Sequence, residues 1–441
     1  MAGEIIFVHV GGCGLNLGVA LWAQIAYEAG VNAAGDIDDG ADGRSEGIEV
    51  LFAEQDGQLR PRAIFADLDP EAVAGVQYHP ALARVPDASF VAGEGGTSGR
   101  FDEGYAGAGR GLLDKIASAV RREVDGCRSL QGFVVVHGAG GGTGGGLGTL
   151  VIEHLRAEYP RAILATFTVL PSSQSASALA AAVCQARTVC ALGATADLCI
   201  LLGNDAANVL LFRAEKLEDP QHADRNQVFA LALASVAAAW RSPAGMSLRK
   251  MAVSLCPVPG ANFQVLSHFP ATANHRLHLA LSEYVAYAFS HYHVLVSLDP
   301  RHGKLLSSVC ILRGELTEVE GEAQALAASA RAARVDWIWD PAKVRVLIDN
   351  SLDSGWSATL IATNTAMKEV LRLVASALMV ARYAREGRTG DGPDEAALEE
   401  VAAALEDLIA QHERLQELGG GVVEATDENE WGEFGAEDDD E

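Results

Sequence analysis

The sequence predicts an α/β fold in which a doubly wound parallel sheet is covered by helices on both faces. Three observations lead to this prediction. Strand-like apolar runs alternate with helix-like stretches through the first half of the chain. The run GFVVVH at 132–137 is almost continuously apolar, as expected of a strand inside a parallel sheet. Directly after it, GAGGGTGGGLGTL at 138–150 has eight glycines in thirteen residues and precedes another helix-like stretch.

The individual elements follow from the spacing of apolar residues. The expected strands of the first half are 4–10, 62–68, 132–137 and 162–171, and the expected helices are 15–30, 111–124 and 149–159. Further along the chain, the strand-like stretches are KMAVSLCPVP (250–259), KLLSSVCILRGEL (304–316) and SATLIATNT (357–365), and they alternate with helical stretches. The stretch 394–417 is strongly amphipathic and predicts a long helix before the C-terminus.

This order of elements predicts the domain organisation. We expect a first α/β domain with a core helix at 1–243, a second, smaller α/β domain at 244–380, a C-terminal helical region at 381–423 and a disordered acidic tail at 424–441. The tail holds ten acidic residues and no basic one, so its charges repel one another and oppose folding. Two roles are open for this tail: a docking strip for basic partners, or a terminus that only increases solubility.

Composition excludes several classes of protein. The 441 residues are 49% hydrophobic and 21% charged, which is typical of a globular protein. No uncharged apolar run reaches transmembrane length and the opening MAGEIIFVHV lacks the features of a signal peptide, so we expect no membrane association. A net charge of −26 without an evident basic face argues against nucleic-acid binding. The seven scattered cysteines form no C-x-x-C pair and suit free thiols in the cytosol.

The glycine-rich stretch at 138–150 indicates a binding function. It lies between a strand and a helix that has Leu147, Leu150 and Leu155 on one face, so it predicts a strand-to-helix turn and not a flexible linker. At such a turn the free N–H groups and the helix dipole attract anions, and glycine lets the backbone approach a phosphate closely. The turn lacks the lysine of a Walker loop, and GGCGLNLG after the first strand has the wrong spacing for a dinucleotide fingerprint.

The segment GGGTGGG (140–146) resembles the tubulin signature, a glycine loop shared with the bacterial division protein FtsZ. The resemblance continues in GGCGLNLG, PRAIFADLDP, DPRHGKLLSSVCILRGEL and RTGDGPDE, and it covers nearly the whole chain, including the final helix and acidic tail. DPRHG (299–303) is most similar to beta-tubulin, which favours a eukaryotic-type tubulin over an FtsZ-like division protein. The resemblance implies that the domain at 1–243 is a GTPase domain that binds GTP or GDP with Mg²⁺.

The resemblance also implies a set of site residues. The phosphates are expected at Gly138, Gly140, Gly141, Gly142, Thr143, Gly144, Gly145 and Gly146, with a loop of Gly96, Thr97, Ser98 and Gly99 closing over the terminal phosphate. A first loop comprises Gly12, Cys13 and Asn16, and the base and ribose are expected at Asn204, Asn226, His222 and Ser177. Asp69 is the expected magnesium ligand, because this ion prefers hard oxygen ligands. Asp67 matches the family too, with capping of the turn before Pro70 as an equal alternative.

Four positions depart from the pattern of the resembled family. Gly12 stands where that family has a glutamine, Ser177 replaces the aspartate at the ribose, Ala181 replaces a glutamate, and His222 replaces the tyrosine that stacks on the base. Each lost hydrogen bond weakens nucleotide binding by about 1 kcal/mol. These departures support a second hypothesis, a pseudo-GTPase interaction module that binds tubulins or centriole proteins without nucleotide turnover.

Hydrolysis in the resembled family uses an acidic residue that one subunit presents to its neighbour's nucleotide. That position is Lys250 in this chain, as in beta-tubulin, and a lysine cannot act as a carboxylate base. We therefore expect no catalytic residue in cis. The chain is a GTPase only if a partner subunit supplies the acid.

Further differences indicate a divergent tubulin that forms or caps microtubule-type polymers, with nucleotide at a longitudinal interface. The stretch between Phe269 and Asp299 is several residues shorter than in beta-tubulin, and MAGE replaces the usual opening. The delta, epsilon and zeta types are divergent in this way, so the expected location is the cytoplasm and cytoskeleton, specifically the centriole, basal body or cilium. Expected partners are other tubulin-family subunits and, through the tail, basic microtubule-associated proteins or motors.

Two other candidate sites are weak. Six histidines fall between His268 and His302 without the spacing of metal ligands, so a partly exposed polar surface explains them better. Ser172 and Ser173 follow a strand but lack the G-x-S-x-G elbow of a hydrolase nucleophile.

Overall fold

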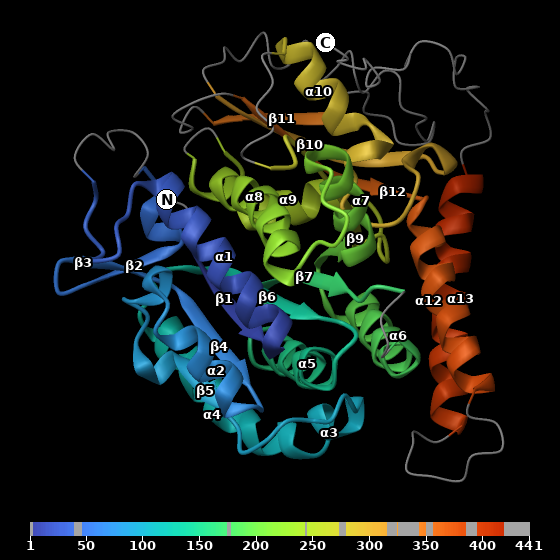
Figure 1. The fold of residues 1–441 in the computed structure, drawn as a ribbon, viewed down its shortest axis with the longest axis horizontal. Helices are drawn as coiled ribbons and strands as arrows, with labels where there is room; N and C mark the ends of the chain where they lie inside the picture. The colour runs from blue at the N-terminus through green and yellow to red at the C-terminus, as the bar shows by residue number, and fades with distance from the viewer. Residues whose placement is uncertain are drawn as a thin grey trace.

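The computed structural model describes residues 3–38, 46–173, 178–242, 245–272, 279–314, 324, 344–349, 356–384 and 395–418. Within these residues, ten strands form one sheet in the order β11-β10-β12-β9-β8-β7-β6-β1-β4-β5 (Figure 1). The strands of this sheet are β1 Glu4–Val10, β4 Ala63–Asp67, β5 Phe90–Ala92, β6 Leu130–Gly138, β7 Ile163–Leu170, β8 Leu198–Gly203, β9 Phe263–Phe269, β10 Leu305–Arg313, β11 Val344–Asp349 and β12 Ser357–Asn364. A separate hairpin consists of β2 Phe52–Gln55 and β3 Gln58–Pro61.

The sheet is parallel over most of its width. The seven strands from β5 to β9 run in the same direction, and of the described strands of this sheet only β12 is antiparallel to its neighbours, β9 and β10. The predicted α/β fold class is therefore confirmed. Cys199 of β8 pairs with Phe263 of β9, so strands on both sides of the expected boundary near residue 244 belong to one continuous sheet.

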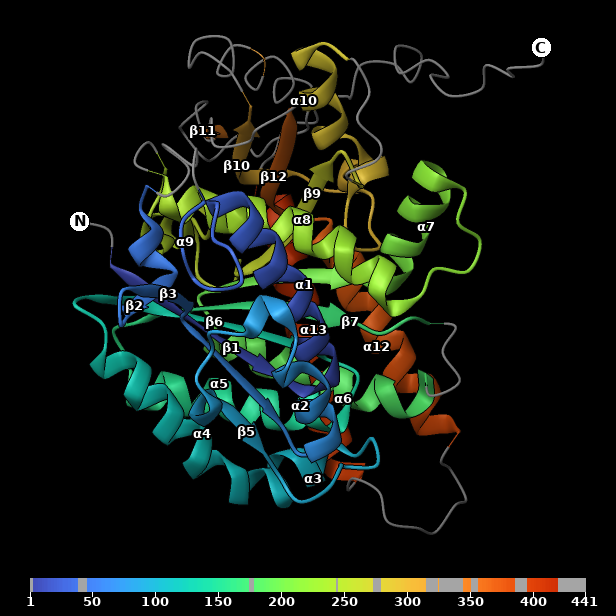
Figure 2. The ribbon, with the colours of Figure 1, turned by 60° about the vertical axis from the view of Figure 1, so that its left-hand side comes forward.

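Helices cover both faces of the sheet. Alternate residues of a strand point to opposite faces, so each face presents its own apolar side chains to the helices. Ile5 and Phe7 of β1 lie in the hydrophobic cluster that includes α1, α8 and α9, whereas Ile6 and Val8 lie in the cluster that includes α4, α5, α6 and α12. Figure 2 shows α4 and α5 on one side of β1 and β6 and α8 on the other. The helices are α1 Gly11–Ala29, α2 Pro70–Gln77, α3 Phe101–Tyr105, α4 Ala108–Asp125, α5 Gly148–Glu158, α6 Ala178–Thr195, α7 Asn204–Glu215, α8 His222–Arg241, α9 Leu248–Leu255, α10 Leu281–Phe289, α12 Met367–Tyr383 and α13 Glu395–Glu417.

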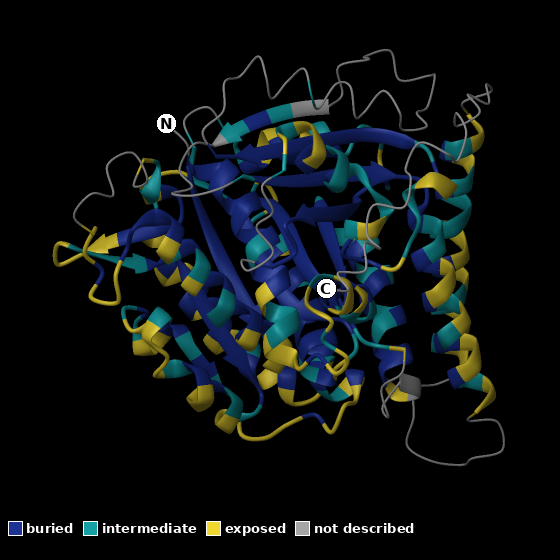
Figure 3. Cartoon of the chain, turned by 45° about the horizontal axis from the view of Figure 1, so that its top comes forward, coloured by how far each residue is buried: buried dark blue, intermediate teal, exposed yellow. Residues whose placement is uncertain are grey.

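The core lies around the sheet and α8. From Val228 to Arg241 almost every residue of α8 is buried, and this part of the helix is rich in alanine, which lets neighbouring elements pack closely. The long helix α13 packs on α12 and α6 and exposes its outer side (Figure 3). Only one face of α13 is apolar, as expected from its amphipathic sequence.

One element has a different structure from the one the sequence predicted. The stretch 250–259 was expected to form a strand, but its residues 250–255 lie in α9. Ser247 caps this helix by accepting a hydrogen bond from the N–H of Lys250 at 3.3 Å. Leu248, Met251 and Leu255 recur at helical spacing and are buried, and this capped amphipathic pattern outweighs the strand-like composition. The other elements expected at stated residue ranges have the predicted type, although α1 begins earlier, at Gly11.

Candidate nucleotide-binding site

The glycine-rich stretch forms the predicted turn between β6 and α5. β6 ends at Gly138, the backbone at Gly141 is extended, and a π-helical turn at Gly142–Leu147 continues directly into α5. No described side chain caps the start of this turn, and its first residues carry no acidic side chain. Backbone N–H groups and the positive end of the helix dipole are therefore presented to an anion at the carboxyl edge of the sheet.

Most glycines of this turn are required by close packing. A Cβ atom on Gly142 would lie 2.5 Å from the carbonyl oxygen of Arg100, and one on Gly144 would lie 2.5 Å from that of Gly138. A Cβ atom on Gly146 would collide with the backbone of Phe101. Gly141 differs, since a Cβ atom there would have no atom within 4 Å, and this residue is exposed. The turn thus packs tightly on one side and faces open space on the other.

The first loop contacts the glycine turn through its backbone. Gly11 has φ +78°, and a Cβ atom there would lie 2.7 Å from the backbone nitrogen of Gly144. Gly12, Cys13 and Asn16 are exposed in the first turns of α1, where the Asn16 side chain donates a hydrogen bond to the carbonyl oxygen of Gly12 at 2.7 Å. A Cβ atom on Gly12 would meet nothing within 4 Å, so packing does not require glycine there.

Cys13 supports the floor of this loop. A Cβ atom on Gly138 would lie 3.0 Å from the Cβ of Cys13, so the two backbones are in close contact.

The loop 96–99 closes one side of the open space. Thr97 is buried against Gly142, whereas Gly96, Ser98 and Gly99 are exposed. Ser98 and Gly99 have φ values of +50° and +77°, the left-handed conformation that turns the chain sharply. The Cys184 thiol of α6 donates a hydrogen bond to the carbonyl oxygen of Gly99 at 3.4 Å and so helps to hold the loop.

Two carboxylates lie at the end of β4. The Asp69 side chain caps α2 by accepting a hydrogen bond from the N–H of Glu71 at 3.0 Å. Asp67 accepts one from the N–H of Asp69 at 3.0 Å, and it also accepts one from the Thr143 hydroxyl. Burial is the main influence on Asp67 and raises the pKa of its carboxyl. The carboxylate in direct contact with the glycine turn is therefore Asp67, and both aspartates supply the hard oxygens that Mg²⁺ prefers.

The residues expected at the base come from two helices. Asn204 is the first residue of α7 and Asn226 lies near the start of α8, and both are half-buried. His222, the first residue of α8, is exposed and its Nδ1 lies 3.1 Å from the Arg225 guanidinium. Arg225 also donates a hydrogen bond to the Asn208 side chain of α7 at 2.8 Å, so it joins the two helices. Ser177 lies outside the described residues.

His137 is a buried residue of this site that the sequence did not indicate. Its Nδ1 lies 2.8 Å from the carbonyl oxygen of Gly144, and its Nε2 lies 3.0 Å from the hydroxyl of Thr168 on β7. Burial lowers the pKa of His137 to about 4, so the ring is neutral and donates from Nδ1 to Gly144. A histidine at the end of an apolar strand, directly before glycines, was the signal in the sequence.

Lys250 lies far from this turn, at the opposite edge of the sheet. The helix that carries it, α9, is anchored by a hydrogen bond from the Leu248 N–H to the Gln131 side chain at 3.0 Å, near the start of β6. Arg249 donates one to the carbonyl oxygen of Arg161, just before β7. The amino ends of these strands are thus beside α9, and their carboxyl ends are beside the glycine turn.

Comparison with known proteins identifies the family. The model of the Tubulin/FtsZ family, GTPase domain, matches residues 4–211. The chain is 30% identical to the tubulin beta-1 chain of Mus musculus over 448 residues, which covers 99% of both chains. It is 31% identical to the tubulin beta-6 chain of Ectocarpus variabilis, covering 97% and 98% of the two chains, and 29% identical to the tubulin beta-3 chain of Oomycete-like sp. (strain MacKay2000), covering 99% of both. The chain belongs to the Tubulin/FtsZ family.

Neither a metal cluster nor a helix able to span a membrane is found in the part of the chain that the structure describes. Among the residues that the structure describes, no three histidine, cysteine or acidic side chains are grouped to hold a metal ion. Of the six histidines between His268 and His302, the described ones belong to several different elements, and two lie outside the described residues. None of the helices described is long and apolar enough to cross a membrane.

Proposed function

We propose that this chain binds GTP or GDP with Mg²⁺ at the glycine turn and serves as a subunit that forms or caps microtubule-type polymers. The observation that carries the proposal is that three separate segments meet this turn. Gly11 packs on Gly144, Thr97 packs on Gly142, and Asp67 bonds to Thr143. The start of α5 is thus surrounded by the first loop at Gly11, the loop 96–99 and the Asp67 carboxylate, and a helix start of this kind binds anions.

Each part of the arrangement has a definite task in this proposal. Backbone N–H groups of the turn bind the phosphates, while Asn204 and Asn226 supply amides that can hydrogen-bond a guanine. Asp67 and Asp69 hold Mg²⁺, which neutralises phosphate charge when bound. Lys250 sits at the opposite edge of the sheet, which suits a head-to-tail arrangement in which each subunit's α9 faces the next subunit's nucleotide.

The direct test is to identify the nucleotide that purifies with the chain. The protein is purified under native conditions and denatured, and the released nucleotide is identified by ion-exchange chromatography. Near-stoichiometric GTP or GDP is the expected result. Protein that is empty and does not take up added GTP would refute the nucleotide-binding function.

A pseudo-GTPase interaction module is the second candidate, and the contacts of two departing residues favour it. The space beside Gly12 is open, and His222 lies against Arg225. Under this alternative the chain acts at centrioles or basal bodies by binding tubulins, and the acidic tail binds basic microtubule-associated proteins or motors. Two results together would support the pseudo-GTPase module over the polymer-forming subunit. The bound nucleotide would not be hydrolysed, with or without partner subunits, and no polymer would form.

A further inference from the structure

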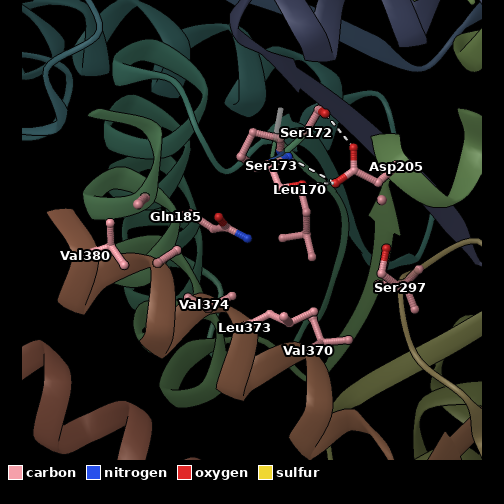
Figure 4. A pocket seen from close by; sticks show the side chains of 15 residues that line it. Leu170, Ser172, Ser173, Gln185, Asp205, Ser297, Val370, Leu373, Val374 and Val380 are labelled. Carbon is pink, nitrogen blue, oxygen red and sulfur yellow. Dashed lines mark hydrogen bonds between the residues drawn. The ribbon is translucent and has the colours of Figure 1, made fainter. Parts of the chain in front are cut away.

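Asp205 joins the start of α7 to the chain segment that follows β7. Its carboxylate accepts a hydrogen bond from the Ser172 hydroxyl at 2.5 Å, and it accepts two from Ser173, at 3.0 Å from the N–H and at 2.9 Å from the hydroxyl (Figure 4). We call these three residues the Asp205 clasp. Hydrogen bonds to a charged acceptor are roughly twice as strong as neutral ones, so the clasp is the main polar tie described for this segment.

The clasp ends beside the glycine turn. Pro171 precedes the two serines and packs on Gly140, because a Cβ atom on Gly140 would lie 2.7 Å from the Pro171 ring. At its other end, Asp205 follows Asn204, the expected guanine ligand, in the first turn of α7. The clasp therefore connects the segment 171–173, which contacts the glycine turn, to α7, the helix that carries Asn204.

Packing alone does not fix this segment. Its other side faces a cavity of about 530 Å³, shown in Figure 4. Gln185 of α6 and Val370, Leu373 and Val374 of α12 line this cavity, and Ser297 lines it from the far side. A segment with a cavity behind it has fewer contacts to resist displacement than one in a filled core. The hydrogen bonds to Asp205 therefore contribute strongly to holding its position.

We propose that Asp205 is a positioning residue for the nucleotide site. The clasp holds Pro171 against Gly140 and sets the spacing between the glycine turn and α7, so that it lengthens the residence of a bound guanine nucleotide. This proposal rests on the proposed function, since it concerns the same site. It adds a residue that was not among those expected from the sequence.

The first experiment measures nucleotide dissociation from the full-length protein. Wild type and variants are loaded with a fluorescent GDP analogue and chased with excess GDP. Asp205→Ala is expected to dissociate about 10-fold faster, the effect of roughly one lost hydrogen bond to a charged acceptor. Asp205→Asn, which keeps one acceptor oxygen, is expected to restore part of the retention. Ser297→Ala, on the far wall of the same cavity, is the matched control and should behave like wild type.

The second measurement uses hydrogen exchange of the nucleotide-free protein and does not depend on nucleotide binding. Asp205→Ala and Ser173→Ala are expected to speed amide exchange at 139–146 and 172–173 and to leave the exchange of β1 and β6 unchanged. If either variant does not fold, the other variant and Asp205→Asn give the same comparison.

The outcomes separate the two proposals. Unchanged dissociation of the nucleotide from Asp205→Ala overturns the role of Asp205 and leaves the proposed function intact. Wild type that binds no nucleotide refutes the proposed function. In that case faster exchange at 139–146 in the variants supports the clasp, and unchanged exchange there overturns it.

Discussion

Glycines at neighbouring positions of this site are present for different reasons. At Gly144 a side chain would meet the carbonyl oxygen of Gly138 at 2.5 Å, so the close approach of two backbones requires glycine. At Gly12 no atom lies within 4 Å of a Cβ position, and a longer side chain has room. The fold therefore does not require glycine at position 12.

Gly12→Gln restores the residue type expected from the resemblance to tubulins. The substitution should raise the affinity for GTP by about 5-fold, the effect of one added hydrogen bond of about 1 kcal/mol. The melting temperature of the nucleotide-free protein should stay unchanged, because the side chain enters open space. Titration with a fluorescent GTP analogue measures the affinity. Weaker binding would show that the space beside Gly12 does not face the nucleotide.

Asp67 and Asp69 show how a residue's task depends on contacts that a motif does not contain. The resemblance pointed to Asp69 as the magnesium ligand and left Asp67 between a family role and a cap. In the structure both carboxylates cap backbone N–H groups: Asp67 accepts from Asp69 in the turn before Pro70, and Asp69 accepts from Glu71 at the start of α2. Asp67 also accepts a hydrogen bond from Thr143 of the glycine turn. Which of the two carboxylates contacts the glycine turn depends on how β4 packs beside that turn, and the sequence motif does not show this.

At the scale of elements, the glycine turn acts as the packing centre of the site. It begins at the end of β6 and contacts α1, α3 and α6 as well as its own helix, α5. His137 fixes its inner side by donating a hydrogen bond to Gly144. The turn packs closely on the backbone of α3, where Gly146 meets Phe101 and Gly142 meets Gly104, so small changes in the turn must move α3 and the loop before it.

Gly146→Ala tests this packing. The added methyl group would collide with the carbonyl oxygen of Phe101, and overpacking of this kind costs about 1–3 kcal/mol of unfolding free energy. Gly141→Ala is the matched control, because its methyl group would enter open space. Thermal unfolding of the two nucleotide-free variants should show a lowered melting temperature for the first only. Equal melting temperatures would contradict the packing argument.

At the scale of the whole molecule, three strand histidines among the described residues are buried in the neutral form. They are His9 in β1, His137 in β6 and His268 in β9, and burial is the main cause that lowers their pKa values to about 3, 4 and 3. Each has an ordinary pKa of about 6.5 in an unfolded chain. Below this pH the unfolded state binds more protons than the folded state, so stability is complete above pH 6.5 and falls as the pH falls.

We therefore expect the chain to lose stability well before most of its carboxylates titrate. Each histidine contributes up to about 1.4 kcal/mol per pH unit, so the three together give a loss of up to about 4 kcal/mol per unit below pH 6. Urea unfolding at pH 7.5, 6.5 and 5.5 measures this slope. A midpoint that is constant over this range would mean that these rings accept protons without unfolding.

The position of Lys250 leads to a prediction about the polymer. Lys250 is exposed on α9 at the amino edge of the sheet and cannot reach the glycine turn of its own subunit. Lys250→Glu should raise phosphate release in a mixture with partner subunits by at least about 10-fold, since a positioned acid–base group contributes 10²-fold or more. Lys115→Glu, an equal charge change on exposed α4, is the control and should have no effect. A high partner-dependent rate that does not respond to Lys250→Glu would exclude this role.

The sequence by itself determined the features that depend on local spacing. Alternating apolar runs predicted the fold class, and the glycines between a strand and an amphipathic helix predicted a strand-to-helix turn, because backbone conformation there depends on neighbouring residues. The same reasoning failed at 250–259, where a Ser247 cap and helical spacing formed α9 in place of a strand.

Tertiary structure decided everything that depends on contacts between distant segments. The packing of individual glycines, the different contacts of Asp67 and Asp69, the hydrogen bond from His137 and the Asp205 clasp all involve residues from different strands and helices. The order of strands in the sheet brings these segments together at one edge and places Lys250 at the other. Sequence spacing does not encode that order, because it arises only when the whole core packs.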